Sequence, residues 1–150
     1  MSAVVDDQPE LVLLTASDLQ EALALWQTAE GVVLRDEDRS PQAFEAFLAR
    51  NPGLSWGVRR GGRLVGAVLA GQDGRRGYIY HLAVADDCRR CGVGRMLVER
   101  MERELIALGI RKAHAYVVNR NLRAQLFWKK VGWISRDEIV LFSRNFPPAP

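Results

Sequence analysis

A short segment rich in arginine and glycine carries the clearest chemical signal in the chain. Residues 89–95 read Arg-Arg-Cys-Gly-Val-Gly-Arg and lie between an apolar run at 81–85 and an amphipathic stretch. Glycine lets the backbone approach a ligand closely. The first N–H groups of a helix lack partners within the helix, and its dipole favours an anion there by about 0.3–1 kcal/mol. Because Arg89, Arg90 and Arg95 add positive charge, the segment predicts a site for a phosphorylated ligand.

The spacing of this segment argues against the two common nucleotide fingerprints. A Rossmann turn requires a third glycine where Leu97 stands, and the P-loop requires a Lys-Ser/Thr pair after its glycine, which is absent. Cys88 and Cys91 form a Cys-x-x-Cys, but without a thioredoxin-like context or further zinc ligands. We therefore expect two ordinary thiols and no metal. A glycine turn without any ligand is the alternative, and three arginines around one helix start argue against it.

Hydrophobic periodicity and turn residues predict the elements that position this segment. Strands are expected at 11–14, 54–60, 63–70, 78–85, 112–118 and 139–143, with a hairpin turn at Gly61-Gly62. Helices are expected after Ser17 with an end at Gly31, after Ser40 up to Asn51, over 93–108, and after Asn121. A loop at 31–39 joins the first two helices. The hairpins and the strand–helix–strand unit at 78–118 predict one mixed sheet of an α+β fold, with helices on both faces and one parallel pair.

Composition limits the class of protein. The chain has 150 residues, 48% hydrophobic and 26% charged, which fits a single domain over 1–150 with loose tails at 1–9 and 147–150. Acidic and basic residues alternate along the chain and leave a net charge of only +3, so we expect no nucleic-acid partner. The pI near 9.2 keeps nucleic-acid binding only as a third alternative. No apolar run reaches about 18 residues, so no membrane span is expected. The acidic N-terminus is unlike a signal peptide, which predicts a cytoplasmic protein.

Two motifs occur in a fixed order, about one helix and one strand apart. The first is Leu82-Ala83-Val84 followed by Arg89-x-x-Gly92-x-Gly94. The second is Asn121-x-x-Ala124-x-x-Phe127-Trp128-x-x-x-Gly132-Trp133. As a pair, they resemble motifs A and B of the GNAT superfamily of acetyl-CoA-dependent N-acetyltransferases, over residues 54–134. The resemblance implies a small single-domain enzyme of bacterial type, with a mostly antiparallel sheet of about six to seven strands and a splayed parallel pair.

The resemblance also implies how coenzyme A would bind. Backbone N–H groups from Cys91 to Arg95 would hold the pyrophosphate, and the main chain of Leu82 and Val84 would pair with the pantetheine arm like an added strand. Asn121 would contact the arm from the other side or act as a helix N-cap, and both roles are compatible. The implied set of cofactor-binding residues is Leu82, Ala83, Val84, Arg89, Arg90, Cys91, Gly92, Val93, Gly94, Arg95, Asn121, Phe127 and Trp128.

The catalytic groups are less well defined. In the family, a motif B tyrosine often protonates the departing thiolate, but Trp128 stands there, and an indole N–H does not give up its proton. Tyr80, Tyr116, water or an unassisted thiolate are the alternatives. The family's strand glutamate is also absent, which leaves His81 or a water chain to accept the proton of the amine, because histidine titrates near neutral pH.

The acceptor follows only indirectly from the sequence. Asp36, Glu37 and Asp38 in the loop at 31–39 suggest a cationic amine, either a small molecule such as a polyamine or a peptide amine, and a solvated acidic loop is the alternative. The resemblance implies transfer of an acetyl group from acetyl-CoA to a primary amine. The missing tyrosine and carboxylate keep a non-catalytic acyl-CoA-binding or sensor domain as the alternative. A homodimer through the last strands is a habit of the family, and the sequence leaves the oligomeric state open.

Overall fold

The computed structural model describes residues 7–29 and 34–149. The strands are β1 (Glu10–Leu13), β2 (Trp56–Arg60), β3 (Arg63–Gln72), β4 (Gly77–Val84) and β5 (Ala113–Ala115). The helices are α1 (Leu19–Thr28), α2 (Asp36–Arg39), α3 (Pro41–Arg50), α4 (Val93–Ala107) and α5 (Leu122–Lys130), with 3-10 turns η1 (Ala16–Asp18) and η2 (Asp86–Cys88). The predicted helix end at Gly31 lies outside the described residues.

One sheet in the order β1-β2-β3-β4-β5 organises the molecule. The first three pairings are antiparallel and the pairing of β4 with β5 is parallel, which confirms the mixed sheet and its parallel pair. The hairpin between β2 and β3 turns at Gly61 and Gly62, where φ is 58° and 79°. Both values are positive, as the tight two-residue turn between twisted strands requires, so the glycine pair explains this turn.

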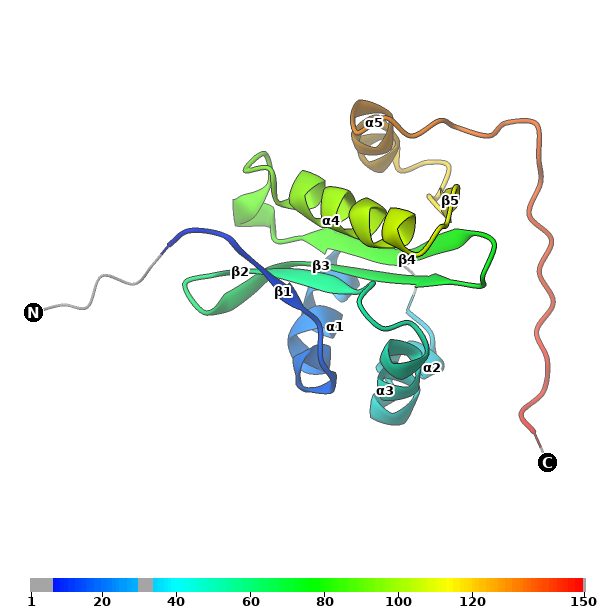
Figure 1. Ribbon diagram of the computed structural model, residues 1–150, viewed down its shortest axis with the longest axis horizontal. Helices are drawn as coiled ribbons and strands as arrows, with labels where there is room; N and C mark the ends of the chain where they lie inside the picture. The colour runs from blue at the N-terminus through cyan, green and yellow to red at the C-terminus, as the bar shows by residue number, and fades with distance from the viewer. Residues whose placement is uncertain (1–6, 30–33, 150) are drawn as a thin grey trace, which may run out of the picture.

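Helices cover both faces of the sheet, as expected (Figure 1). On one face, α4 buries Leu97 and Met101 against the strands, and this core extends to Trp128 of α5. On the other face, Trp26 of α1 and Phe44 of α3 form a second core. The sheet therefore separates two apolar cores, and β4 contributes side chains to both of them, Ile79 to the first and Ala83 to the second.

The sheet has five strands among the described residues, not the six to seven that the resemblance implied. The predicted last strand at 139–143 is wrong: the segment pairs with no strand in the described part of the chain and its side chains are exposed, with Phe142 at 91%. The predicted strand at 112–118 is reduced to β5, and the loop at 31–39 contains the short helix α2. The apolar pattern at 139–143 favours an extended chain, but a strand also needs a neighbouring edge, and this segment runs away from the sheet (Figure 1).

Strand β4 carries a β-bulge near its centre. Leu69 of β3 lies opposite His81, whereas the next residue, Ala70, lies opposite Ile79, so Tyr80 is an extra residue. A bulge breaks the strict alternation of side chains between the two faces of a sheet. Tyr80 and His81 can therefore both face the same layer, although they are neighbours in the chain.

Candidate active site

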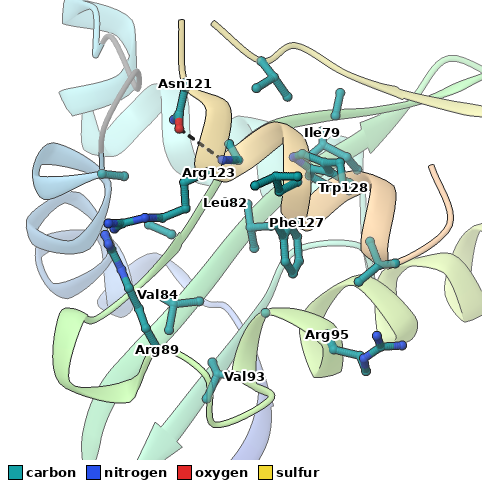
Figure 2. Close-up of a pocket in the computed structure, with 18 of the residues that line it drawn as sticks. Ile79, Leu82, Val84, Arg89, Val93, Arg95, Asn121, Arg123, Phe127 and Trp128 are labelled. Atoms are coloured by element: carbon teal, nitrogen blue, oxygen red, sulfur yellow. Dashed lines mark hydrogen bonds between the residues drawn. The ribbon is translucent and has the colours of Figure 1, made fainter. Parts of the chain in front are cut away.

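A cavity opens where the parallel pair of strands ends. The pairing stops at Ile79 of β4 and Ala115 of β5, while β4 continues to Val84. The cavity has a volume of about 980 Å³ and lies between the unpaired half of β4, the turn before α4, and α5. Because one edge of β4 from Tyr80 to Val84 has no neighbouring strand among the described residues, its main chain is available to an extended ligand (Figure 2).

The glycine turn forms one end of this cavity. Gly92 is the N-cap of α4 with a φ of 81°, and a Cβ placed on it would meet no atom within 4 Å. The first hydrogen bond of α4 runs from the Met96 N–H to the Gly92 carbonyl oxygen, at 3.0 Å. The three N–H groups of residues 93–95 thus have no acceptor within the helix, and the dipole of this 15-residue helix favours an anion in front of them. The turn has the local geometry predicted for a phosphate site.

Helix α5 closes the other side of the cavity and approaches the turn closely. A Cβ placed on Gly94 would lie 3.0 Å from the ring of Phe127, so only glycine allows this approach without displacement. The side-chain oxygen of Asn121 accepts a hydrogen bond from the Ala124 N–H at 3.1 Å, which confirms its N-cap role. Trp128 is buried, and its ring packs against Phe127 and Trp133 at centroid distances of 5.4 and 4.6 Å. Trp128 thus belongs to the core and also lines the cavity.

The arginines of the turn do not all converge. Arg89 lines the cavity and also pairs with Asp86 at 2.9 Å. Its guanidinium group points toward that of Arg123 on α5, whereas Arg95 lies on the opposite side of the cavity (Figure 2). Arg95 forms a long ion pair with Glu99, at 3.7 Å. Arg90 also lines the cavity and has a positive φ of 66°.

Arg123 is a site residue that sequence reasoning missed. No carboxylate among the described residues forms an ion pair with it, and it lies in the first turn of α5, where the helix dipole disfavours a cation. This position, two residues after Asn121, is the signal that could have identified it. Two guanidinium groups that face one another repel, and an anion between them removes that repulsion. Arg89 and Arg123 therefore extend the predicted phosphate site across the cavity.

The candidate proton-transfer groups lie at the other end of the cavity. Tyr80, at the bulge, is 47% exposed and packs edge to face on Phe47 of α3 at 5.6 Å. Partial burial raises the pKa of Tyr80 above that of a free phenol, which keeps it protonated at neutral pH. Tyr116 follows β5 and is 55% exposed. All three candidates of the sequence analysis, including His81, line the same cavity.

His81 has a partner that the sequence did not predict. Its Nε2 atom lies 3.1 Å from Oδ1 of Asp38 on α2, 43 positions away in the chain. Its ring packs on Trp26 of α1 at a centroid distance of 5.2 Å. The acidic cluster therefore contributes Asp38 to the site, while Asp36 and Glu37 remain exposed.

Other features of the turn are consistent with ordinary structural roles. Cys88 is buried, Cys91 is exposed, and both thiols are free. The described part of the chain holds no group of three or more side chains arranged to bind a metal ion. Over the same residues, no helix combines the length and the apolar character that a membrane crossing requires.

Comparison with known proteins places this architecture in one family. The Acetyltransferase (GNAT) family profile matches residues 19–133, so the chain belongs to that family. An acetyltransferase of Yersinia enterocolitica is 31% identical over 135 residues, which span 90% of this chain and 94% of the relative. The protein is thus an acyltransferase enzyme of the GNAT superfamily.

Solved structures show the same fold. Ard1 from Thermoplasma volcanium matches with a TM-score of 0.74 and 18% identity, covering 84% of this chain and 82% of that one. The aminoglycoside N-acetyltransferase AAC(6')-Iy, solved with a bisubstrate analogue of CoA and acetylneamine, matches with a TM-score of 0.74 and 15% identity, covering 93% and 99%. These neighbours support a GNAT-like mixed fold for this chain.

Proposed function

We propose that this enzyme transfers the acetyl group of acetyl-CoA directly to a primary amine. The observation that carries the proposal is the cavity between β4 and β5, which has the N-terminus of α4 at one end and Tyr80, His81 and Tyr116 at the other. One elongated donor would span the two ends. The AAC(6')-Iy complex with a CoA-containing bisubstrate analogue supports this choice, because a protein of the same fold holds such a ligand.

The cofactor lies along β4 in this proposal. The pyrophosphate binds the N–H groups between Cys91 and Arg95, and Arg89 and Arg123 provide charge-assisted hydrogen bonds to the phosphates. The pantetheine arm pairs with the main chain of residues 82–84 on the edge that β5 leaves free. Its acetyl group then reaches the bulge at Tyr80.

The chemical step conserves atoms and charge. A neutral amine attacks the carbonyl carbon of the thioester, the C–N bond forms, and the C–S bond breaks. The leaving thiolate takes up one proton and the amide nitrogen loses one, which gives N-acetyl product and free coenzyme A. A backbone N–H of β4 near Leu82 polarises the carbonyl, and Tyr80, Tyr116 or water supplies the proton to the thiolate. Trp128 is not the acid in this scheme, because an indole does not release its proton.

The acceptor is a primary amine on a small molecule or a peptide. An aminoglycoside acetyltransferase from a soil metagenomic sample, solved with sisomicin, supports the small-molecule class. The exposed carboxylates of Asp36 and Glu37 favour a cationic acceptor such as a polyamine or an aminoglycoside.

Thiol release tests the proposal. Purified enzyme is mixed with acetyl-CoA and a panel of aminoglycosides, polyamines, lysine peptides and free peptide N-termini, and the acetylated product is identified by mass spectrometry. Turnover with at least one amine is expected, with intersecting initial-rate patterns and no acetylated enzyme. Cys91→Ser keeps the backbone N–H at the proposed pyrophosphate site and removes the exposed thiol, so direct transfer predicts unchanged turnover. Tight CoA binding without turnover on any amine would contradict the proposal.

A further inference from the structure

The bulge in β4 gives the α1–α3 layer two adjacent polar side chains. Ile79 belongs to the core under α4, Tyr80 packs on Phe47 of α3, and His81 packs on Trp26 of α1. In a regular strand, Tyr80 and His81 would point to opposite faces. The extra residue instead turns both toward the layer that carries α2, and both still line the cavity.

A hydrogen bond at the N-terminus of α2 holds the Asp38 carboxylate in the position from which it contacts His81. Its Oδ2 atom accepts a hydrogen bond from the Arg35 N–H at 2.8 Å, at the N-terminus of α2. Its Oδ1 atom is then directed to Nε2 of His81 at 3.1 Å. The side chains of Asp38 and His81 are 21% and 10% exposed, so water competes little for this contact. Both carboxylate oxygens are thus used, one by the helix and one by the histidine.

This contact determines which ring nitrogen of His81 carries the proton. An ionised carboxylate only accepts hydrogen bonds, so Nε2 must donate and therefore holds a proton. In the neutral ring, Nδ1 then keeps its lone pair and can accept a second proton. The carboxylate also stabilises the imidazolium ion that forms when Nδ1 is protonated. Among the groups that pack around His81, Trp26 of α1 and Leu69 of β3 do not titrate, whereas Asp38 of α2 and the neighbouring Tyr80 do.

We infer that Asp38 is a positioning residue that fixes His81 as the proton acceptor for the incoming amine. The inference rests on the proposed amine acetylation. The ammonium form of the acceptor loses one proton to Nδ1 of His81, its nitrogen lone pair attacks the thioester, and the proton then passes to water through the open cavity. Strand β4 thus supplies the proton acceptor, α2 supplies the residue that positions it, and the turn before α4 holds the donor.

The experiment compares His81→Gln and Asp38→Asn with matched controls. His114→Gln changes the other histidine, which packs on Tyr78 in the parallel pair, and Glu45→Gln removes an exposed carboxylate of α3. We expect kcat to fall at least 30-fold in His81→Gln and at least 10-fold in Asp38→Asn, with the KM for acetyl-CoA within twofold of wild type. Both controls keep kcat within twofold. The double variant should be no slower than His81→Gln alone, because Asp38 acts through His81.

A pH profile separates positioning from mere structural support. The acidic limb of kcat/KM for the amine should be present in the wild type and absent in His81→Gln. Thermal unfolding and the Kd for coenzyme A show whether each variant is folded, and Asp38→Asn keeps an oxygen acceptor for α2. A kcat within twofold of wild type in His81→Gln, or fully additive effects in the double variant, would overturn the inference. Failure of the wild type to acetylate any amine would instead refute the proposed function.

Discussion

The two faces of the sheet are specified in different ways. On the face of α4 and α5, the residues of the proposed donor site come from two contiguous motifs, at 82–94 and 121–133. On the face of α1, α2 and α3, the contact between His81 and Asp38 joins positions 43 apart and belongs to no motif. The difference shows that short-range sequence encodes the donor side, whereas the acceptor side depends on how the layers pack.

Both faces have an apolar core, and the α1 face adds ion pairs to it. Fully buried Leu97 and Met101 attach α4 to the sheet by apolar packing. On the other face, Arg59 of β2 forms ion pairs with Asp18 at 2.7 Å and with Glu21 of α1 at 2.9 Å. Apolar packing is insensitive to protonation, so pH should act mainly on the α1 face.

The largest expected effect comes from Gly92→Ala. Alanine at this position would have to adopt a left-handed backbone conformation, and its methyl group would enter the space proposed for the pyrophosphate. We expect the Kd for acetyl-CoA to rise at least about 30-fold, equivalent to one charge-assisted hydrogen bond or more. Gly53→Ala is the matched control, because Gly53 has a φ of 80° and an equally open Cβ position away from the cavity. Isothermal titration calorimetry measures both Kd values, and Gly53→Ala should bind acetyl-CoA like the wild type. Equal losses of affinity in the two variants would show that the turn does not bind the cofactor.

Arg123→Ala comes next. Loss of one guanidinium from the pair with Arg89 should weaken coenzyme A binding about tenfold and flatten its dependence on salt concentration. Arg95→Ala should change the Kd less than threefold, because Arg95 lies on the other side of the cavity (Figure 2). The two variants would behave alike if the turn acted only as a diffuse positive patch.

Trp128→Phe should affect stability more than turnover. The ring is buried between Phe127 and Trp133, so a smaller ring should cost about 1–2 kcal/mol of unfolding free energy. We expect kcat to stay within about threefold of wild type. A hundredfold fall in kcat in a folded variant would instead give the indole N–H a direct catalytic role.

The smallest effect is expected from Glu21→Gln. The hydrogen bond from Arg59 holds the pKa of Glu21 below its ordinary value. A carboxyl whose pKa is lower in the folded state stabilises the protein above its unfolded pKa and loses this contribution as the pH falls. Because the Glu21 side chain is half exposed, the loss in Glu21→Gln should be only about 0.5 kcal/mol at pH 7 and should be smaller at pH 3. Denaturant unfolding at both pH values measures it, and coenzyme A affinity should not change.

Several features of the fold followed from the sequence because neighbouring residues determine them. Ser40 caps α3 by accepting the Ala43 N–H, and Asn121 caps α5 in the same way. Gly61-Gly62 formed the expected hairpin, and the helix after the arginine–glycine turn began at Val93 as predicted. Caps, tight turns and amphipathic periods act within a few residues, so they can be read without knowing the rest of the fold.

The sequence by itself thus determined the family and the turn proposed to hold phosphate, since both lie in contiguous residues. Only the tertiary structure decided the rest. The segment at 139–143 has the pattern of a strand, yet no edge within the described structure receives it. The bulge at Tyr80 depends on the register with β3, and the approach of Arg123 to Arg89 and of Asp38 to His81 depends on how helices dock. These features arise from surfaces that meet across long stretches of chain, and no local pattern encodes where such surfaces will lie.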